Sequence, residues 1–262
     1  MRVDGILERS DLYERAGKNP HAFCTNIDRE GDVRILANMK ANAYWMETIL
    51  HELGHGVYDL GIDAGLPWLL RTYPHLSTTE AAAMFFGRLA QDPSWMRRAL
   101  GLSDAEAKRV GCGAASALRA KQLVFARWCQ VMFRFERELY RNPRGDLNAL
   151  WWDLVERYQL VRRPDRRDEP DWATKIHVVS SPVYYHNYML GEMIASLFSR
   201  RVRERFCADG AGLHGRREVG DWFTEEVFRP GNRHRWDRHV ELATGARLSA
   251  AAFAEQFVEG AP

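Results

Sequence analysis

Residues 41–59, ANAYWMETILHELGHGVYD, contain no proline, and their apolar side chains recur at intervals of three and four residues. That spacing predicts an α-helix with one apolar face. His51 and His55 lie four residues apart, so both point to the same side of this helix. Glu52 directly follows the first histidine. Two imidazoles on one helical face, with a carboxylate beside them, indicate a site for one metal ion.

The five residues 51–55, HELGH, form an H-E-x-x-H motif. In such a motif the two histidines bind zinc, and the glutamate is turned far enough from the metal to reach a water molecule on it. Zinc lowers the pKa of that water, and the glutamate accepts its proton. We therefore expect a metallopeptidase with one Zn²⁺ ion and with Glu52 as its general base.

A catalytic zinc site needs a third protein ligand. Glu80 is the best candidate, because it lies 25 residues after His55 and begins a helix expected over residues 77–91. Two antiparallel helices would bring its carboxylate opposite the two histidines. Two alternatives stay open: Glu80 also completes a capping box with Ser77, which would only close the start of the helix, and His75 is a rival third ligand.

A second polar cluster follows at residues 175–188, KIHVVSSPVYYHNY. Peptide hydrolysis passes through an oxyanion, and hydrogen-bond donors aimed at that oxygen stabilise it by several kcal/mol. Tyrosine hydroxyls and histidine N–H groups are suitable donors. An ordinary aromatic core is the alternative, but buried hydroxyls and imidazoles need partners, which a substrate cleft supplies.

Composition excludes several classes of protein. The net charge is only +2, and the arginines are dispersed among acidic residues, so we expect no nucleic-acid partner. The four cysteines are far apart and form no C-x-x-C pair. The first 17 residues carry charges throughout and resemble no signal peptide, and no stretch is apolar over the roughly 18 residues of a membrane span. We expect a cytoplasmic protein without a membrane partner.

Four motifs in order, HELGHGVYD, STTEAAAMFFGRL, WWDLVERYQ and KIHVVSSPVYYHNYMLGE, resemble the angiotensin-converting-enzyme-like peptidases. They are similar, less closely, to the thimet oligopeptidase and oligoendopeptidase F families of the same gluzincin group. The resemblance runs from about His21 to the C-terminus. It implies a helical, two-lobed enzyme that cuts short peptides with one zinc ion, as a peptidyl-dipeptidase or an oligopeptidase. It also implies that His51, His55 and Glu80 are the zinc ligands and Glu52 the general base.

The same resemblance assigns roles outside the metal centre. It implies that His177 contacts the substrate near the scissile bond and that Tyr188 stabilises the oxyanion. Lys175 and Tyr185 match positions that hold the C-terminal carboxylate of the substrate, although the segment between His177 and the tyrosine pair is one residue longer here, so the neighbouring tyrosine is an alternative. Ala22 lies in a segment that resembles an edge strand pairing with the substrate backbone.

The expected fold is mainly α: a multi-helix, zincin-like catalytic lobe with a small β element near the N-terminus. A hairpin is expected within residues 21–37, closed near Glu30 and Gly31. Further helices are expected over residues 103–142, 146–160, 182–206, 219–228, 235–243 and 249–258. The whole chain, residues 1–262, is expected to form a single catalytic lobe with an N-terminal segment (1–40), zinc-binding helices (41–92) and a helical part with the substrate cluster (93–262).

Two departures from the family pattern matter. Met84 stands where the converting enzyme has an aspartate that supports a zinc-bound histidine, so another acid such as Asp59 would have to do so. The family's enzymes are also about twice as long. A missing N-terminal lobe or a second subunit is therefore a possible partner, with an exposed apolar face around residues 103–140. The alternative function is a zinc-binding but inactive half-enzyme that requires a partner chain.

Overall fold

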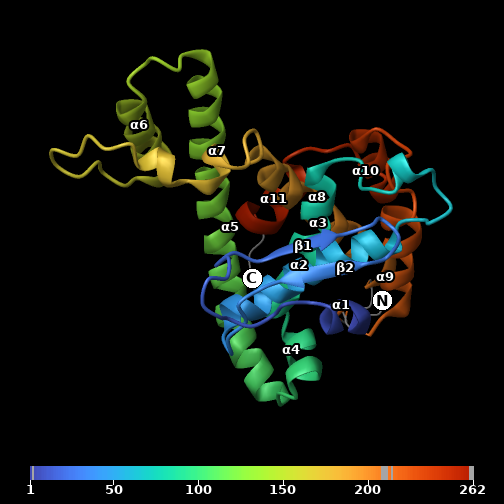
Figure 1. The fold of residues 1–262 in the computed structure, drawn as a ribbon. Helices are drawn as coiled ribbons and strands as arrows, with labels where there is room; N and C mark the ends of the chain where they lie inside the picture. The colour runs from blue at the N-terminus through green and yellow to red at the C-terminus, as the bar shows by residue number, and fades with distance from the viewer. Residues whose placement is uncertain (2, 208–211, 214, 260–262) are drawn as a thin grey trace. The chain divides into compact units, whose positions relative to one another are not determined.

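Helix α2 (Ala43–Gly61) occupies the centre of the N-terminal part of the protein in a computed structural model, which describes residues 1, 3–207, 212–213 and 215–259 (Figure 1). The helix is capped by Asn42, whose side chain accepts a hydrogen bond from the Trp45 N–H at 2.9 Å. Helix α3 (Leu76–Gly87) packs against α2. Every residue from 77 to 85 is buried, so α3 is an interior helix.

The β element is a hairpin of two antiparallel strands, β1 (Phe23–Asn26) and β2 (Val33–Leu36). Both strands contact α2, and the hairpin lies across this helix in Figure 1. The turn between them contains two residues with positive φ, Arg29 at 60° and Gly31 at 115°. The hairpin expected within residues 21–37 is therefore confirmed, with a longer turn than Glu30 and Gly31 alone.

A buried lysine holds the N-terminal segment against β2. The Lys18 ammonium donates hydrogen bonds to the backbone carbonyls of Asp11 (2.9 Å), Tyr13 (2.8 Å) and Ala37, and it also contacts the Asp11 carboxylate at 2.9 Å. Its side chain is only 1% exposed. Because the charge is satisfied by several oxygens, its burial is compatible with a stable fold. The preceding helix α1 (Asp4–Glu8) packs beside β2 through Ile6.

The chain forms two compact units. Unit 1 comprises Met1–Ala115 and Gly191–Pro262, and unit 2 comprises Ser116–Leu190. Besides α1–α3 and the hairpin, unit 1 contains the following elements: 3₁₀ turns over Trp68–Leu70 and Arg88–Gln91, α4 (Pro93–Leu100), α9 (Arg217–Trp222), π-helical turns over Phe223–Phe228 and Glu255–Glu259, α10 (Trp236–Thr244) and α11 (Ala251–Ala254).

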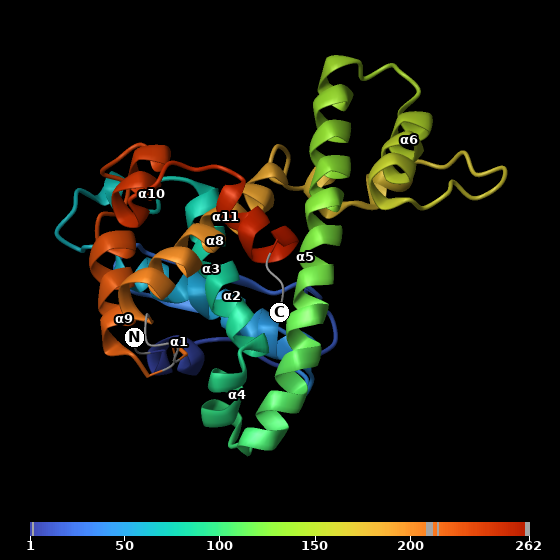
Figure 2. The same cartoon turned by 180° about the vertical axis from the view of Figure 1, so that it is seen from behind.

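Two long helices are shared between the units. Helix α5 (Asp104–Arg141) begins in unit 1 and continues into unit 2, whereas α8 (His186–Phe206) begins in unit 2 and continues into unit 1. Unit 2 also holds α6 (Leu147–Gln159), a 3₁₀ turn over Asp171–Thr174 and α7 (Ile176–Val179). Helix α6 lies beside the C-terminal half of α5 (Figure 2), and their side chains share a core that includes Met132, Phe135 and Trp151.

The mainly α fold with a small sheet is confirmed, and most helix boundaries agree with the sequence to within two residues. Helix α8 is an exception: it begins at His186 rather than at residue 182, since Pro182 and Val183, which has a φ of 56°, precede it in a turn. Helix α4 was not expected. No helix in the described residues combines the length and the low charge needed to cross a bilayer.

Candidate active site

Two neighbouring helices bring three possible metal ligands together in unit 1. His51 and His55 project from α2 and Glu80 from α3, and one ligand atom of each lies within 4.8 Å of the others. The Glu80 Oε2 atom is 3.5 Å from His51 Nε2 and 3.9 Å from His55 Nε2. In the described part of the chain no other trio of histidine, cysteine or acidic residues converges in this way. Two imidazoles and a carboxylate are a donor set that suits catalytic zinc.

A hydroxyl orients one of the histidines. The second ring nitrogen of His55, Nδ1, lies 2.7 Å from Thr79 Oγ1. An imidazole that binds a metal through Nε2 carries its proton on Nδ1 and therefore donates to this oxygen. The expectation that an acid such as Asp59 supports a zinc-bound histidine is thus wrong for His55. The H-E-x-x-H motif does not point to Thr79, which is one of four consecutive polar residues at the start of α3.

The start of α3 decides between the alternatives for Glu80. The N-cap residue is His75, whose Nδ1 accepts a hydrogen bond from the Ser77 N–H at 3.3 Å. Ser77 lies inside the helix, so the capping box expected of Ser77 and Glu80 is not formed. The His75 ring packs against Trp236, with a centroid distance of 5.4 Å, and takes no part in the trio. Glu80, and not His75, faces the two histidines.

Glu52 is a buried carboxyl group next to this trio, with 7% of the residue exposed. Burial raises its pKa to about 8, and the negative charge of Glu80 adds to the shift. A hydrogen bond from the Cys24 backbone N–H lowers the pKa in part. Burial, together with the neighbouring His51, lowers the pKa of His55 well below its ordinary value. A neutral imidazole is the form that binds a metal.

The edge of strand β1 that faces away from β2 lies beside Glu52. The register pairs Phe23 with Leu36, and the Ile27 N–H donates to the Asp32 carbonyl at 2.8 Å. Because backbone groups alternate along an antiparallel pair, the N–H and C=O groups of Ala22 and Cys24 point away from β2. The hydrogen bond from Cys24 to Glu52 agrees with this direction. Ala22 therefore lies where an added strand would find backbone partners.

The second polar cluster assembles within unit 2. His177 Nε2 lies 3.0 Å from the Tyr188 hydroxyl, and the His177 ring contacts three tyrosine rings at centroid distances of 5.0–6.0 Å. Of the tyrosine pair, Tyr185 is buried and its hydroxyl bonds the Trp128 side chain, whereas Tyr184 is half-buried. Burial raises the pKa of Tyr185. The cluster thus pairs an imidazole with a phenol, both of which are hydrogen-bond donors.

Lys175 lines a separate cavity of about 510 Å³ in unit 2. Its ammonium lies 5.7 Å from the ring centroid of Trp128 and 5.8 Å from that of Trp151. Two aromatic faces attract a cation and limit its motion. The Arg167 and Asp171 ion pair lines the same cavity, and Trp152 donates to Asp171 at 3.2 Å. The tryptophans around Lys175 come from α5 and α6, so only the packing of these helices shows that they surround the lysine.

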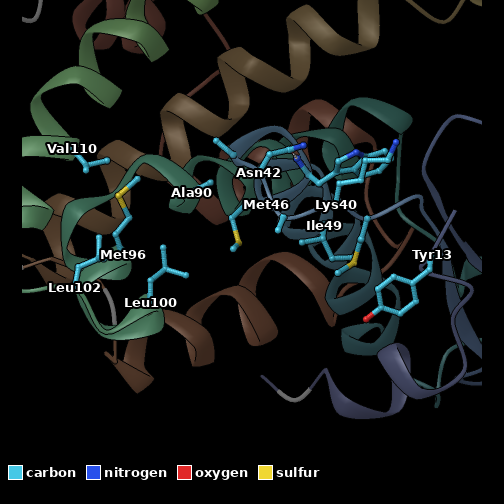
Figure 3. A pocket seen from close by; sticks show the side chains of 14 residues that line it. Tyr13, Lys40, Asn42, Met46, Ile49, Ala90, Met96, Leu100, Leu102 and Val110 are labelled. Carbon is cyan, nitrogen blue, oxygen red and sulfur yellow. Dashed lines mark hydrogen bonds between the residues drawn. The ribbon is translucent and has the colours of Figure 1, made fainter.

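A larger cavity, of about 630 Å³, lies in unit 1 (Figure 3). Its lining is mostly apolar and includes Trp45, Met46 and Ile49 of α2. At 100° per residue these side chains lie roughly 80–180° around the helix from His51 and His55. None of the candidate metal ligands lines this cavity. We therefore treat it as distinct from the metal centre.

Comparisons with known proteins agree with this geometry. The model of Peptidase family M3 matches residues 7–259. Angiotensin-converting enzyme-related protein of Drosophila melanogaster is 22% identical over 256 residues, and the match covers 90% of this chain and 40% of that protein. The chain therefore spans less than half the length of this curated relative.

Solved structures share the fold. An M32 carboxypeptidase from Deinococcus radiodurans R1 superposes on this chain with a TM-score of 0.69 at 20% sequence identity. The superposition covers 90% of this chain and 54% of the carboxypeptidase. The structure of PZ peptidase A with an inhibitor gives a TM-score of 0.73 at 18% identity, with coverage of 95% and 42%. Both superpositions include nearly the whole of this chain but only about half of the longer protein.

Proposed function

Because the chain belongs to Peptidase family M3, we propose that it is a zinc-dependent peptidase that hydrolyses peptide bonds in short peptides. The observation that carries this proposal is the convergence of His51, His55 and Glu80 from two helices, with Glu52 as the next residue after the first histidine. The donor set fits one Zn²⁺ ion held by these three residues, which would leave a fourth position open. A bound zinc ion would polarise the substrate carbonyl and make water more acidic.

Glu52 acts as the general base in this proposal. Its carboxylate accepts a proton from the attacking water and later delivers it to the leaving amine. Burial favours this role, because it raises the pKa of the carboxyl group above its ordinary value and makes the carboxylate a stronger proton acceptor. A cation on the neighbouring ligands would lower the pKa of Glu52 again, because a nearby positive charge favours the carboxylate.

The cluster of unit 2 supplies the other groups. Tyr188 and His177 donate hydrogen bonds to the oxygen that becomes negative during the reaction. Lys175 binds the C-terminal carboxylate of the substrate, and of the tyrosine pair the partly exposed Tyr184 is better suited than Tyr185 to assist it.

The substrate backbone pairs with the outer edge of β1. The outward N–H and C=O groups of Ala22 match those of an extended peptide, and strand addition places successive peptide groups at fixed intervals. A peptide held in this way lies next to Glu52, whose carboxylate bonds the same strand at Cys24. The proposed substrate is therefore a short peptide in an extended conformation.

A second candidate function is a zinc-binding but inactive half-enzyme that needs a partner. The observation in its favour is that the chain spans only 40% of its curated relative and about half of the solved structures. The partner would be a polypeptide that corresponds to the remaining part of those proteins. The apolar cavity of unit 1 and the exposed side chains at its rim, including Leu100 and Val110, form a surface that such a polypeptide would cover.

A digest of a mixed peptide library by the zinc-loaded protein tests both candidates, with products identified by mass spectrometry. We expect cleavage by the parent and a loss of at least about 100-fold in Glu52→Gln, which keeps the metal ligands but removes the base. Released C-terminal dipeptides indicate a peptidyl-dipeptidase, whereas internal cuts indicate an oligopeptidase. Full activity of Glu52→Gln contradicts the assigned base. One bound zinc per chain without cleavage favours the half-enzyme.

A further inference from the structure

Helices α2 and α3 are in close backbone contact at Gly54, which lies between the two histidines. A Cβ atom added to Gly54 would lie 2.6 Å from the Ala83 Cα and 3.1 Å from both the Ala82 carbonyl oxygen and the Ala83 nitrogen. All three contacts are with backbone atoms, so no side-chain rotation can make room. A side chain at residue 54 requires the two helices to move apart.

The same contact determines how far the metal ligands are from one another. Gly54 lies within one helical turn of His51 and His55 on α2, and Ala83 lies within one turn of Glu80 on α3. Carbon atoms in contact normally stay about 3.5–4.0 Å apart, so relieving the 2.6 Å contact of an added methyl group would separate the helices by roughly 1 Å. Metal–ligand distances vary by only about 0.2 Å. The displacement therefore exceeds what the metal site can absorb.

We propose that Gly54 is a positioning residue for the metal centre: the absence of a side chain there sets the separation of α2 and α3, and so the distance of Glu80 from His51 and His55. This inference rests on the proposed zinc site. The hydrogen bond of 2.7 Å between His55 and Thr79 joins the same two helices and lengthens with them.

A second glycine makes a weaker contact on the other side of α3. A Cβ atom at Gly191 of α8 would lie 3.0 Å from the Glu80 Cβ and 3.1 Å from the Met84 sulfur. The sulfur is part of a flexible side chain, but the Glu80 Cβ belongs to the metal ligand itself. Gly191→Ala therefore presses on Glu80 directly, with a smaller displacement than Gly54→Ala.

The experiment measures metal affinity rather than turnover. The dissociation constants of the full chain for Zn²⁺ and Co²⁺ are determined by competition with a chromogenic chelator, and the visible absorption of bound Co²⁺ is recorded. For Gly54→Ala we expect a rise of about 10- to 100-fold in both dissociation constants, as is typical when support of metal ligands is lost. The Co²⁺ bands should also change, because they report ligand geometry.

Two matched variants separate positioning from general destabilisation. Gly56→Ala changes the same helix, but its Cβ would meet the flexible end of the Ile6 side chain at 2.8 Å. The three atoms nearest to this Cβ belong to Ile6, Val33 and Cys24, and none belongs to α3. For Gly56→Ala we expect a melting temperature below that of the parent, but the same metal affinity and the same Co²⁺ spectrum as the parent. Gly113→Ala lies in α5 with nothing within 4 Å of the new Cβ, and should keep the parent metal affinity and Co²⁺ spectrum. Its melting temperature should equal or slightly exceed that of the parent, because alanine favours a helix more than glycine does.

The proposal is overturned if Gly54→Ala folds and has the same dissociation constant and the same Co²⁺ spectrum as the parent. If circular dichroism shows that Gly54→Ala is unfolded, Gly191→Ala decides: an increase of about tenfold supports positioning of Glu80 through its helix contacts, and an unchanged constant overturns it. A parent protein that binds no metal refutes the proposed zinc site itself, and so is distinguished from a failure of the inference.

Discussion

At the scale of single residues, the metal cluster depends on groups that the H-E-x-x-H motif does not contain. His55 has to be neutral and correctly turned to bind a metal, and the hydroxyl oxygen of Thr79 accepts a hydrogen bond from the N–H group of its second ring nitrogen. Burial alone would leave the ring orientation undetermined, because an imidazole can rotate about its χ2 angle. One hydroxyl on the neighbouring helix therefore fixes both the tautomer and the direction of the ligand.

Thr79→Val tests this role, because valine keeps the volume and removes the hydroxyl. We expect the dissociation constant for Zn²⁺ to rise by roughly 10- to 100-fold, while Thr79→Ser stays close to the parent because it retains the acceptor oxygen. Chelator competition measures both variants. An equal loss of affinity in the valine and serine variants would assign the effect to packing and not to the hydrogen bond.

At the scale of elements, α3 is held between α2 and α8, and a buried ion pair fixes the end of this arrangement. Arg88 directly follows α3 and pairs with Glu192 of α8, and their side chains are 10% and 6% exposed. The Arg88 guanidinium also lies 5.0 Å from the Phe257 ring centroid in the C-terminal π-helical turn. These contacts join three segments of unit 1: the end of α3, helix α8 and the C-terminal π-helical turn. Arg88 and Glu192 lie within about one helical turn of Met84 and Gly191, which are next to Glu80.

Breaking this pair on one side should be costly. Glu192→Gln leaves the Arg88 charge buried without a counterion, and we expect the free energy of unfolding to fall by about 3–5 kcal/mol in urea titrations. Glu226→Gln serves as the matched control, because the Arg205–Glu226 pair is 43% and 35% exposed and should change stability by less than about 1 kcal/mol. Similar losses of unfolding free energy in Glu192→Gln and Glu226→Gln would contradict the larger contribution expected of the buried Arg88–Glu192 pair.

At the scale of the whole molecule, the two polar clusters belong to different compact units. The trio of possible metal ligands lies in unit 1, and His177 with Tyr188 lies in unit 2. A metal ion held by these three residues would link α2 to α3 within unit 1 and would favour the folded form of that unit. Metal binding should therefore be visible in the stability of the protein, independently of any peptide substrate.

Zinc is expected to stabilise the folded chain by mass action. At a free concentration 100 times the dissociation constant the gain is about 2.7 kcal/mol, which corresponds to a rise of roughly 5–10 °C in Tm for a chain of this size. Differential scanning calorimetry of the apo and zinc-loaded protein measures it. His51→Ala, which lacks one ligand, should show little of this rise. An undiminished rise in that variant would place the bound zinc elsewhere.

Local patterns predicted much of this protein. The 3.6-residue spacing of apolar side chains is a property of the chain itself, so α2, α5 and α6 were predicted to within two residues. The four motifs likewise led to the metallopeptidase resemblance, which the match to Peptidase family M3 confirms. Helix α4 was missed because eight residues supply only two turns, too short a stretch for periodicity to be distinctive.

Only the tertiary structure decided which groups face each other. The sequence left Glu80 open between a metal ligand and a helix cap; the close contact at Gly54 and the cap at His75 place its carboxylate beside the two histidines. Likewise, Thr79 as the partner of His55 follows from the packing of α3 on α2 and from no motif. Helical spacing specifies the side of a helix on which a residue lies, but the neighbour on that side is specified by packing between segments distant in sequence.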